Sequence, residues 1–184
     1  MEAAIGKDAG GYEPSAFIGD FNNDKTADVL LSMATGGSGG IVQYALLSFK
    51  DNRAQALFDY EKFNEGIDLK VKFLPDYKAE LKSDSINKSE ILDLTYNKDT
   101  YIELGIYDND GKIKKSTEGW IDGYGELKPV DIYLDGSFEL IGTQRVSGCC
   151  HADSIAHLVT TWKWDGQKMN LEQTDIMMPF FTKE

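Results

Sequence analysis

Long apolar runs are missing from this sequence. No apolar stretch approaches the roughly 20 residues that a helix needs to cross a bilayer, so no membrane span is expected. The first six residues also lack the charged and apolar regions of a signal peptide. We expect Met1 to be an added start residue on a trimmed mature protein.

Basic residues are scarce relative to acidic ones. Lys and Arg together number 19 against 31 Asp and Glu, which gives a formal net charge of −12. Nucleic-acid-binding domains usually present a basic patch, so no nucleic-acid partner is expected. An acidic surface is instead compatible with the binding of cations.

Familiar catalytic motifs are also lacking. The sequence contains no phosphate-binding loop, no nucleophile elbow and no His/carboxylate metal motif. The glycine-rich run at 36–40 lies between two expected strands and does not open a helix, so it is interpreted as a flexible turn. The sequence therefore favours a non-enzymatic function.

Oxygen-bearing side chains are concentrated in residues 20–28, directly before an apolar run at 29–31. Ca²⁺ prefers roughly six to eight oxygen ligands, and alternate residues of a tight loop can point their oxygens inward. An EF-hand would need a glutamate where Leu31 stands, so a calcium loop of another kind is expected. The expected ligands are the side chains of Asp20, Asn22, Asp24 and Asp28 and the carbonyl of Thr26.

The alternative for this segment is an Asp/Asn-rich turn that binds no ion. Three carboxylates within nine residues repel one another unless a cation neutralises them, which favours the calcium interpretation.

A second, weaker loop of this kind lies at residues 131–139. Its candidate ligands are Asp131, Asp135, Ser137 and Glu139. Tyr133 stands at the third position, where it removes a ligand and adds bulk. An ion-free turn around Asp135 is the favoured interpretation, and ion binding is the alternative.

The segment from Gly19 to Asp28, followed by a hydrophobic strand, resembles the FG-GAP/VCBS repeat, the calcium-loop blade of integrin-alpha-type β-propellers. It is also similar to small secreted VCBS-repeat proteins of Gram-positive bacteria, where loop and strand run into a glycine-rich turn, as at 32–40 here. The resemblance implies antiparallel propeller-like blades, Ca²⁺ as cofactor, and an extracellular or bacterial cell-surface location. Lys25 departs from the pattern, because such loops usually place Gly there.

Strand and turn patterns run along the whole chain and predict a single all-β domain over 1–184. Alternating or apolar stretches predict the following strands, among others: 29–33, 41–49, 101–107 and 156–164. The glycine- and aromatic-rich segment 120–125 is expected to be a link.

The two loops start 111 residues apart (131 − 20), which allows approximate repeat units of 16–75, 76–128 and 129–184. Three units would not close a ring, because closed propellers have about 4–8 blades. We therefore expect either an incomplete propeller or an open, propeller-like or sandwich-like body.

Two adjacent cysteines lie close to both histidines of the chain, in the order Cys149, Cys150, His151 and His157. Adjacent thiols point apart in a strand, and structural zinc pairs are usually spaced more widely, so zinc is disfavoured. A vicinal disulfide and two ordinary thiols both stay open. A catalytic Cys–His pair would need an activated thiolate.

Four aromatic residues are candidates for a sugar-stacking platform: Trp120, Tyr124, Trp162 and Trp164. Trp162 and Trp164 share one strand face because they are two residues apart. Core packing is the commoner role of such pairs.

These patterns favour a calcium-stabilised binding or structural module that presents a surface to a protein or glycan partner. The alternatives are a carbohydrate-binding, lectin-like domain and an enzyme that uses the segment 149–157.

Overall fold

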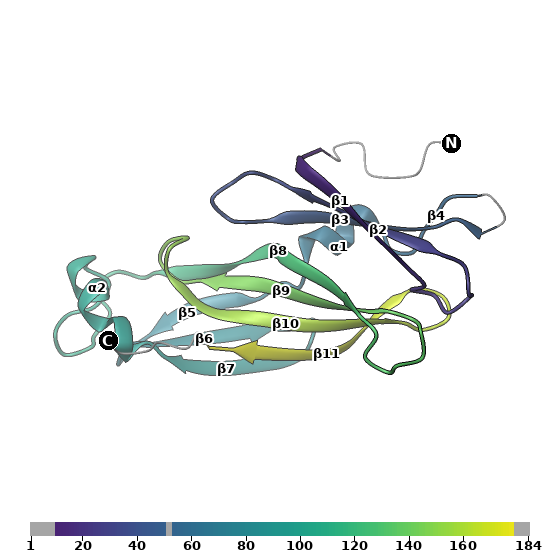
Figure 1. Ribbon diagram of the computed structural model, residues 1–184. Helices are drawn as coiled ribbons and strands as arrows, with labels where there is room; N and C mark the ends of the chain where they lie inside the picture. The colour runs from purple at the N-terminus through teal and green to yellow at the C-terminus, as the bar shows by residue number, and fades with distance from the viewer. Residues whose placement is uncertain (1–9, 51–52, 179–184) are drawn as a thin grey trace. The chain divides into compact units, whose positions relative to one another are not determined.

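A computed structural model describes residues 10–50 and 53–178, which form a β protein with antiparallel strand pairs (Figure 1). The predicted all-β class is confirmed. The strands are β1 (Tyr12–Gly19), β2 (Asp28–Ala34), β3 (Val42–Ser48), β4 (Gln55–Ala56), β5 (Lys70–Leu74), β6 (Lys78–Ser83), β7 (Lys88–Asp93), β8 (Glu118–Val130), β9 (Glu139–Ser147), β10 (Ser154–Trp164) and β11 (Met169–Met177). The helices are α1 (Tyr60–Glu65) and α2 (Lys98–Glu103), with a 3₁₀ turn at Thr95–Asn97.

The strands form a four-stranded and a seven-stranded sheet. The first has the order β1-β2-β3-β4, in which strands that follow one another in sequence are also neighbours, as in a meander. The second has the order β11-β10-β9-β8-β5-β6-β7. This wider sheet takes strands from all three predicted repeat units, 16–75, 76–128 and 129–184.

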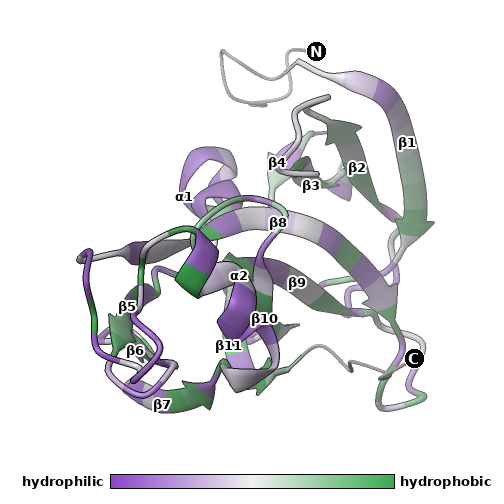
Figure 2. Cartoon of the chain, turned by 90° about the vertical axis from the view of Figure 1, so that its left-hand side faces the viewer, coloured by the Kyte–Doolittle hydropathy of each residue, from purple (hydrophilic) through white to green (hydrophobic). Residues whose placement is uncertain are grey.

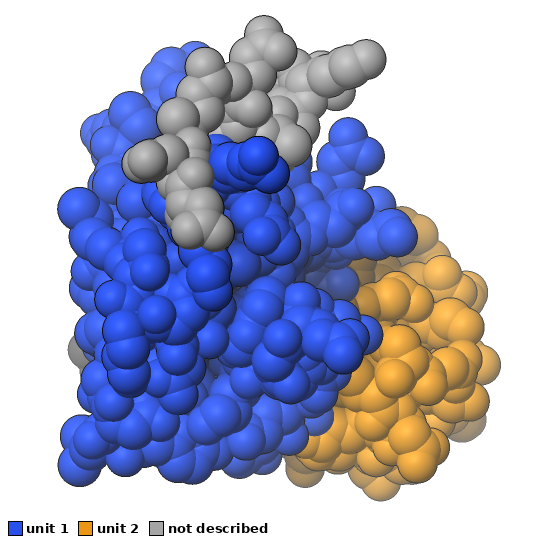
Figure 3. All heavy atoms as spheres, turned by 90° about the vertical axis from the view of Figure 1, so that its right-hand side faces the viewer, with its two compact units in different colours: residues 1–66, 122–144, 158–177 blue, residues 67–121, 145–157, 178–184 orange. Residues whose placement is uncertain are grey.

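The chain divides into two compact units, each built from separated segments (Figure 3). Of the described residues, unit 1 contains 10–50, 53–66, 122–144 and 158–177, and unit 2 contains 67–121, 145–157 and 178. The long strands β8, β9 and β10 each contribute residues to both units.

Aromatic side chains form much of the core of unit 1. Phe63, the buried residue of α1, stacks on Phe58 with ring centroids 4.0 Å apart and on Tyr124 at 5.2 Å. The helix begins at the Asp59 side chain, which accepts a hydrogen bond from the Lys62 backbone N–H and so caps a free donor. A short helix is thus held by one cap and one buried ring.

Unit 2 is organised by strict alternation along β5 and β6. Val71 and Phe73 are buried, whereas Lys70 and Lys72 are exposed, as expected for strands with one solvated face. Figure 2 shows similar apolar and polar bands following one another along β8 and β9. The Tyr107 hydroxyl joins this core to the backbone, because it shares its proton between the carbonyls of Leu74, the last residue of β5, and Lys78, the first residue of β6.

Two local predictions are wrong. Residues 101–107, predicted as a strand, include the second half of α2, whose Tyr101 is fully buried. Residues 120–125, predicted as a link, lie inside β8. The glycines of β8 permit close approach of other backbone segments, since a Cβ at Gly119 would lie 2.3 Å from the carbonyl oxygen of Ser147.

Helices α1 and α2 have six residues each. In the described part of the chain, no helix is long and apolar enough to cross a membrane.

Candidate functional site

The predicted calcium loop, residues 20–28, connects β1 to β2 in unit 1. Gly19 and Asp28 form the last pair of the ladder between these strands, so the loop leaves and re-enters the sheet at neighbouring points. Asn23 and Lys25 have positive φ angles of 57° and 65°. Lys25 therefore adopts the backbone conformation for which the FG-GAP/VCBS pattern usually provides glycine.

Two carboxylates at the ends of this loop each keep one buried oxygen without a donor among the described residues. Asp28 is fully buried, and its Oδ2 accepts the Phe21 backbone N–H at 2.9 Å while Oδ1 has no partner. Asp20 Oδ2 accepts the Lys25 backbone N–H at 2.9 Å, and Oδ1 again has no partner. Buried acceptors of this kind are normally satisfied, so each of these oxygens is expected to take a partner from outside the chain, either a water molecule or a cation.

The middle of the loop is held by its own side chains. Asn22 Oδ1 accepts the Asp24 backbone N–H, and Asp24 Oδ1 accepts the Thr26 backbone N–H, at 3.0 and 2.9 Å. Each acceptor oxygen retains a second lone pair. Asp24 Oδ2 also lies 3.6 Å from the ammonium of Lys50.

The carboxylates of the loop differ in their ionisation. Burial raises the pKa of Asp28, and the negative charges of Asp24 and Asp20 raise it further, against the lowering effect of the Phe21 backbone N–H and the nearby Ser48 hydroxyl. The Thr26 backbone N–H, followed by the Thr26 hydroxyl and Lys50, lowers the pKa of Asp24. The buried end of the loop thus disfavours negative charge unless a cation is present.

Across residues 10–50 and 53–178, no three His, Cys, Asp or Glu side chains gather in an arrangement that could hold a metal. The predicted calcium ligands also include the Asn22 amide and the Thr26 carbonyl, which are oxygens of other kinds. Calcium binding therefore stays a prediction.

In the second loop, hydrogen bonds within the loop occupy the carboxylates. Asp131 accepts the backbone N–H groups of Asp135 and Gly136, at 3.1 and 3.0 Å. Asp135 Oδ1 accepts both the backbone N–H and the hydroxyl of Ser137, at 2.9 and 2.6 Å. These hydrogen bonds all lie within the loop, as in an ordinary turn.

The remaining candidate of the second loop, Glu139, is paired with a lysine. Glu139 is 2% exposed, its Oε2 accepts the Ile132 backbone N–H, and its Oε1 lies 3.2 Å from the ammonium of Lys163. The same ammonium lies 3.3 Å from the ring centroid of Tyr133. Burial lowers the pKa of Lys163, but the hydrogen bond and charge of Glu139 outweigh it, and the pKa is raised. Lys163 thus supplies the positive charge beside Glu139.

The two loops are joined to each other within unit 1. The Phe138 backbone N–H donates to the Asp20 carbonyl at 2.8 Å, next to a parallel bridge between Asp20 and Ser137. The Phe138 ring packs against Phe17 and Phe21, with centroids 5.0 and 5.9 Å away. Loop 20–28 and loop 131–139 therefore share backbone and core contacts.

The cysteine segment lies in unit 2, where Asp153 organises it. The carboxylate of Asp153 accepts the Cys149 backbone N–H at 2.9 Å and the Tyr101 hydroxyl at 2.9 and 3.0 Å. Cys149 and Cys150, both within the described ranges, are free thiols. Burial, followed by hydrogen bonding to Asp153 and its charge, raises the pKa of Cys149 to about 12, which opposes the activated thiolate that a catalytic cysteine needs.

The histidines of this segment have other partners. His151 Nδ1 lies 3.3 Å from an Arg145 guanidinium nitrogen, and its ring meets Trp120 edge-on at 5.0 Å. Burial and the charge of Arg145 lower the pKa of His157.

The four predicted platform aromatics have different surroundings. Tyr124 is fully buried and its hydroxyl accepts the Trp162 indole N–H at 3.0 Å, so both belong to the core of unit 1. Trp120 belongs to unit 2. Trp164 lines a small pocket beside loop 20–28.

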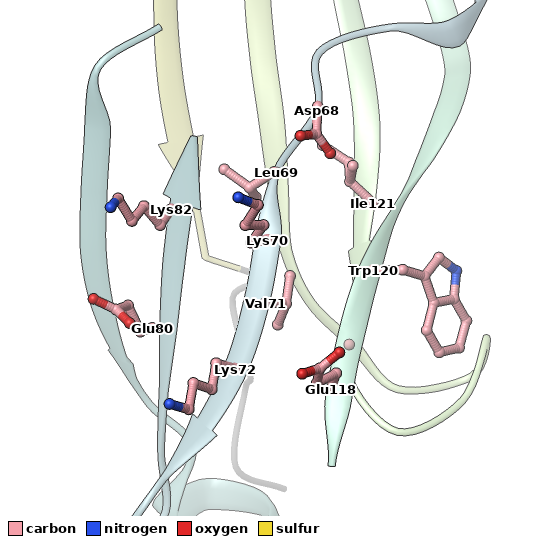
Figure 4. A pocket seen from close by; sticks show the side chains of 11 residues that line it. Asp68, Leu69, Lys70, Val71, Lys72, Glu80, Lys82, Glu118, Trp120 and Ile121 are labelled. Carbon is pink, nitrogen blue, oxygen red and sulfur yellow. The ribbon is translucent and has the colours of Figure 1, made fainter. Parts of the chain in front are cut away.

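Sequence reasoning missed a groove of about 520 Å³ on β5, β6 and β8 of unit 2 (Figure 4). Charged side chains of both signs line it: Lys72 stands opposite Glu80 and Glu118 in the strand register. Lys70 and Lys82, which also stand opposite each other, both approach Asp84, at 3.5 and 3.4 Å. The alternating lysines of these strands predict a solvent-exposed face of the sheet, but they do not predict that this face forms a groove.

We expect Lys163→Met to lower the free energy of unfolding by about 1–3 kcal/mol, because it leaves buried Glu139 without its cation. Urea unfolding measures this change. Lys163→Arg keeps the charge and should remain near wild type, and adding Glu139→Gln to Lys163→Met should recover most of the loss. A Lys163→Met protein as stable as wild type would contradict the pairing.

We expect one fast and one slow thiol when the native protein is titrated with Ellman's reagent at pH 8. Exposed Cys150 should react first, while the raised pKa of Cys149 keeps its thiolate fraction small until the pH approaches that pKa. Cys150→Ser should remove the fast phase and Cys149→Ser should keep it. A native protein with no reactive thiol would instead indicate a disulfide.

Comparisons with known proteins place this chain in a family. Residues 67–177 match the family described as the YybI C-terminal domain. The chain is 37% identical over 158 residues to "Uncharacterized protein YybI" of Bacillus subtilis (strain 168), an alignment that covers 86% of this chain and 60% of that protein. The chain thus spans about three-fifths of the length of this relative. No solved structure matches it. Because the matched residues make up most of its length, the chain belongs to the YybI C-terminal domain family.

Proposed function

We propose that this chain is a non-enzymatic, calcium-stabilised binding or structural module. The observation that supports it best is the pair of buried carboxylate oxygens, Asp20 Oδ1 and Asp28 Oδ1, that have no donor among the described residues. They belong to the first and last residues of one short loop. A cation between them would satisfy both acceptors and offset the repulsion between their charges.

The donor set of the loop fits Ca²⁺ better than a transition metal, because it consists of oxygen atoms alone. Asp20 and Asp28 would provide the buried ligands. Asn22 and Asp24 would use the lone pairs that their backbone hydrogen bonds leave, and the Thr26 carbonyl would complete the protein's contribution. Hard cations of this kind accept water in the remaining positions.

The sheet β1-β2-β3-β4 supports the proposal of an FG-GAP/VCBS-like blade. It is a four-stranded antiparallel meander with the candidate calcium loop at its first turn. The seven-stranded sheet is wider than the four-stranded blade of a propeller, so the proposal concerns residues 12–56. An extracellular or cell-surface location would suit a site filled at the high calcium concentrations found there.

The proposed role of the ion is to fasten the end of β1 to the start of β2. Through the Asp20 carbonyl it would also fix the contact with Phe138 and hence loop 131–139. A ligand that binds only the folded state stabilises it by mass action. The two joined loops would then present an ordered surface to a protein or glycan partner.

We expect Ca²⁺, added to protein that has been treated with EDTA, to raise the melting temperature by about 5–10 °C at a hundredfold excess over Kd. Mg²⁺ should raise it much less, because it demands a tighter octahedral shell. Asp20→Asn and Asp28→Asn should abolish the shift, since each removes a ligand charge and keeps the side-chain size. Differential scanning calorimetry measures the effect.

Asp131→Asn is the matched control for this experiment, because Asp131 already accepts two backbone N–H groups. It should leave the calcium response unchanged. The absence of a shift in the wild-type protein at millimolar Ca²⁺ would show that loop 20–28 is only a turn and would end the proposal. A shift that only Asp131→Asn removes would move the ion to the second loop.

A further inference from the structure

A pocket of about 230 Å³ borders the candidate calcium loop in unit 1. The loop contributes Asn22 and Asp24 to its lining, and β4 and β10 contribute Gln55 and Trp164. The pocket therefore places two of the proposed calcium ligands next to an aromatic ring. Its volume is below the roughly 300–1,000 Å³ of typical ligand pockets, so it suits one small ring and not a long chain.

The apolar part of the lining comes from Trp164 and Leu57. Trp164 is half-buried and packs partly on the core, and Leu57 is 4% exposed. An indole is a large, rigid apolar surface that loses little conformational freedom on binding. Such a surface suits the C–H face of a saturated ring.

The polar part of the lining offers both donors and acceptors. Within the described residues, neither the exposed Gln55 side chain nor the Trp164 indole N–H has a hydrogen-bond partner. Asp24 Oδ2 and the Lys50 ammonium lie 3.6 Å apart, and the Lys50 side chain is 63% exposed and free to turn outward. Asn22 Nδ2 donates to the Ser48 hydroxyl at 3.3 Å. Hydroxyl groups both donate and accept, so a ring with several hydroxyls matches this mixture.

We propose that this pocket binds a single sugar residue of a glycan, with its apolar face on Trp164 and its hydroxyls on Gln55, Asp24 and Asn22. The proposal rests on the proposed function in one respect: an ion in the loop would hold Asn22 and Asp24 in place. The contacts of Trp164 and Gln55 do not depend on the ion. The larger groove of unit 2 is lined mainly by lysine and carboxylate side chains, and two of its lysines, Lys70 and Lys82, approach the same carboxylate, Asp84.

The test is saturation-transfer NMR and calorimetric titration with the methyl glycosides of glucose, galactose, mannose and N-acetylglucosamine, with citrate as a charged probe that is not a sugar. We expect at least one glycoside to bind. Gln55→Ala should weaken that binding about tenfold, as the loss of a ligand hydrogen bond does. Trp164→Phe keeps an aromatic ring, loses the N–H and should weaken binding as well.

Trp120→Phe and Gln173→Ala are matched controls, because they make the same changes at positions outside the pocket, and both should bind as wild type does. Circular dichroism on every variant separates lost binding from lost folding. The proposal is overturned when none of the four glycosides binds, when binding is unaffected by both pocket variants, or when citrate binds and the glycosides do not.

Each titration is repeated in Ca²⁺ and in EDTA, beside the calorimetric melting measurement. A calcium-induced rise in melting temperature without any glycoside binding overturns the sugar site and leaves the calcium module standing. If a glycoside binds equally well in EDTA and Ca²⁺ does not change the melting temperature, the sugar site is supported and the calcium module is overturned. The two proposals can thus fail separately.

Discussion

A fully buried carboxylate, Asp28, lies where β1 and β2 meet, and much of unit 1 depends on how its charge is balanced. The backbone N–H that it accepts belongs to Phe21, whose ring is 1% exposed and sits in the core against Phe17 and Phe138. Exposure of this carboxylate would break its hydrogen bond with the backbone of Phe21, the residue whose ring is held in the core. The charge of Asp28 and the apolar packing of Phe21 are therefore linked through the same backbone hydrogen bond. Burial of an uncompensated charge is unfavourable, which is why the pKa of Asp28 is raised and why the proposed cation would be expected to stabilise the fold.

The two loops of unit 1 show two ways to balance such a charge. In loop 131–139 the buried Glu139 has a cation from the chain itself, since Lys163 lies 3.2 Å away and is held over the Tyr133 ring. In loop 20–28 the nearby lysine, Lys50, approaches Asp24 and is mostly exposed. The two unsatisfied oxygens belong to the other carboxylates of that loop. Similar spacings of acidic residues thus have different electrostatic outcomes, and the difference depends on a lysine 24 positions (163 − 139) beyond Glu139.

Strand positions were predictable where alternation decides them, and not where tertiary contacts decide them. The predicted strands 29–33, 41–49 and 156–164 correspond to β2, β3 and β10. Residues 101–107 carry β-forming side chains, yet Tyr101 lies in a helix from which its hydroxyl reaches the distant Asp153. Local propensity does not register such a contact. The glycines of β8 predict a link from the sequence alone, because the sequence does not show that they permit the close approach of another strand's backbone.

The candidate site likewise has features that the sequence predicts and features that only the fold reveals. The spacing of oxygen-bearing residues identified loop 20–28, but only the geometry identifies which oxygens lack donors, and only the fold brings Gln55 and Trp164 to the loop. The family match covers residues 67–177, so it includes Trp164 and loop 131–139 but not loop 20–28 or Gln55. The pocket therefore combines residues from inside and outside the matched region. Trp164, its aromatic wall, lies inside that region, whereas most of its polar groups and the loop of the proposed ion lie in the segment before it. Membership in the family alone predicts neither proposal, because the loop that would hold the ion lies outside the region that defines the family.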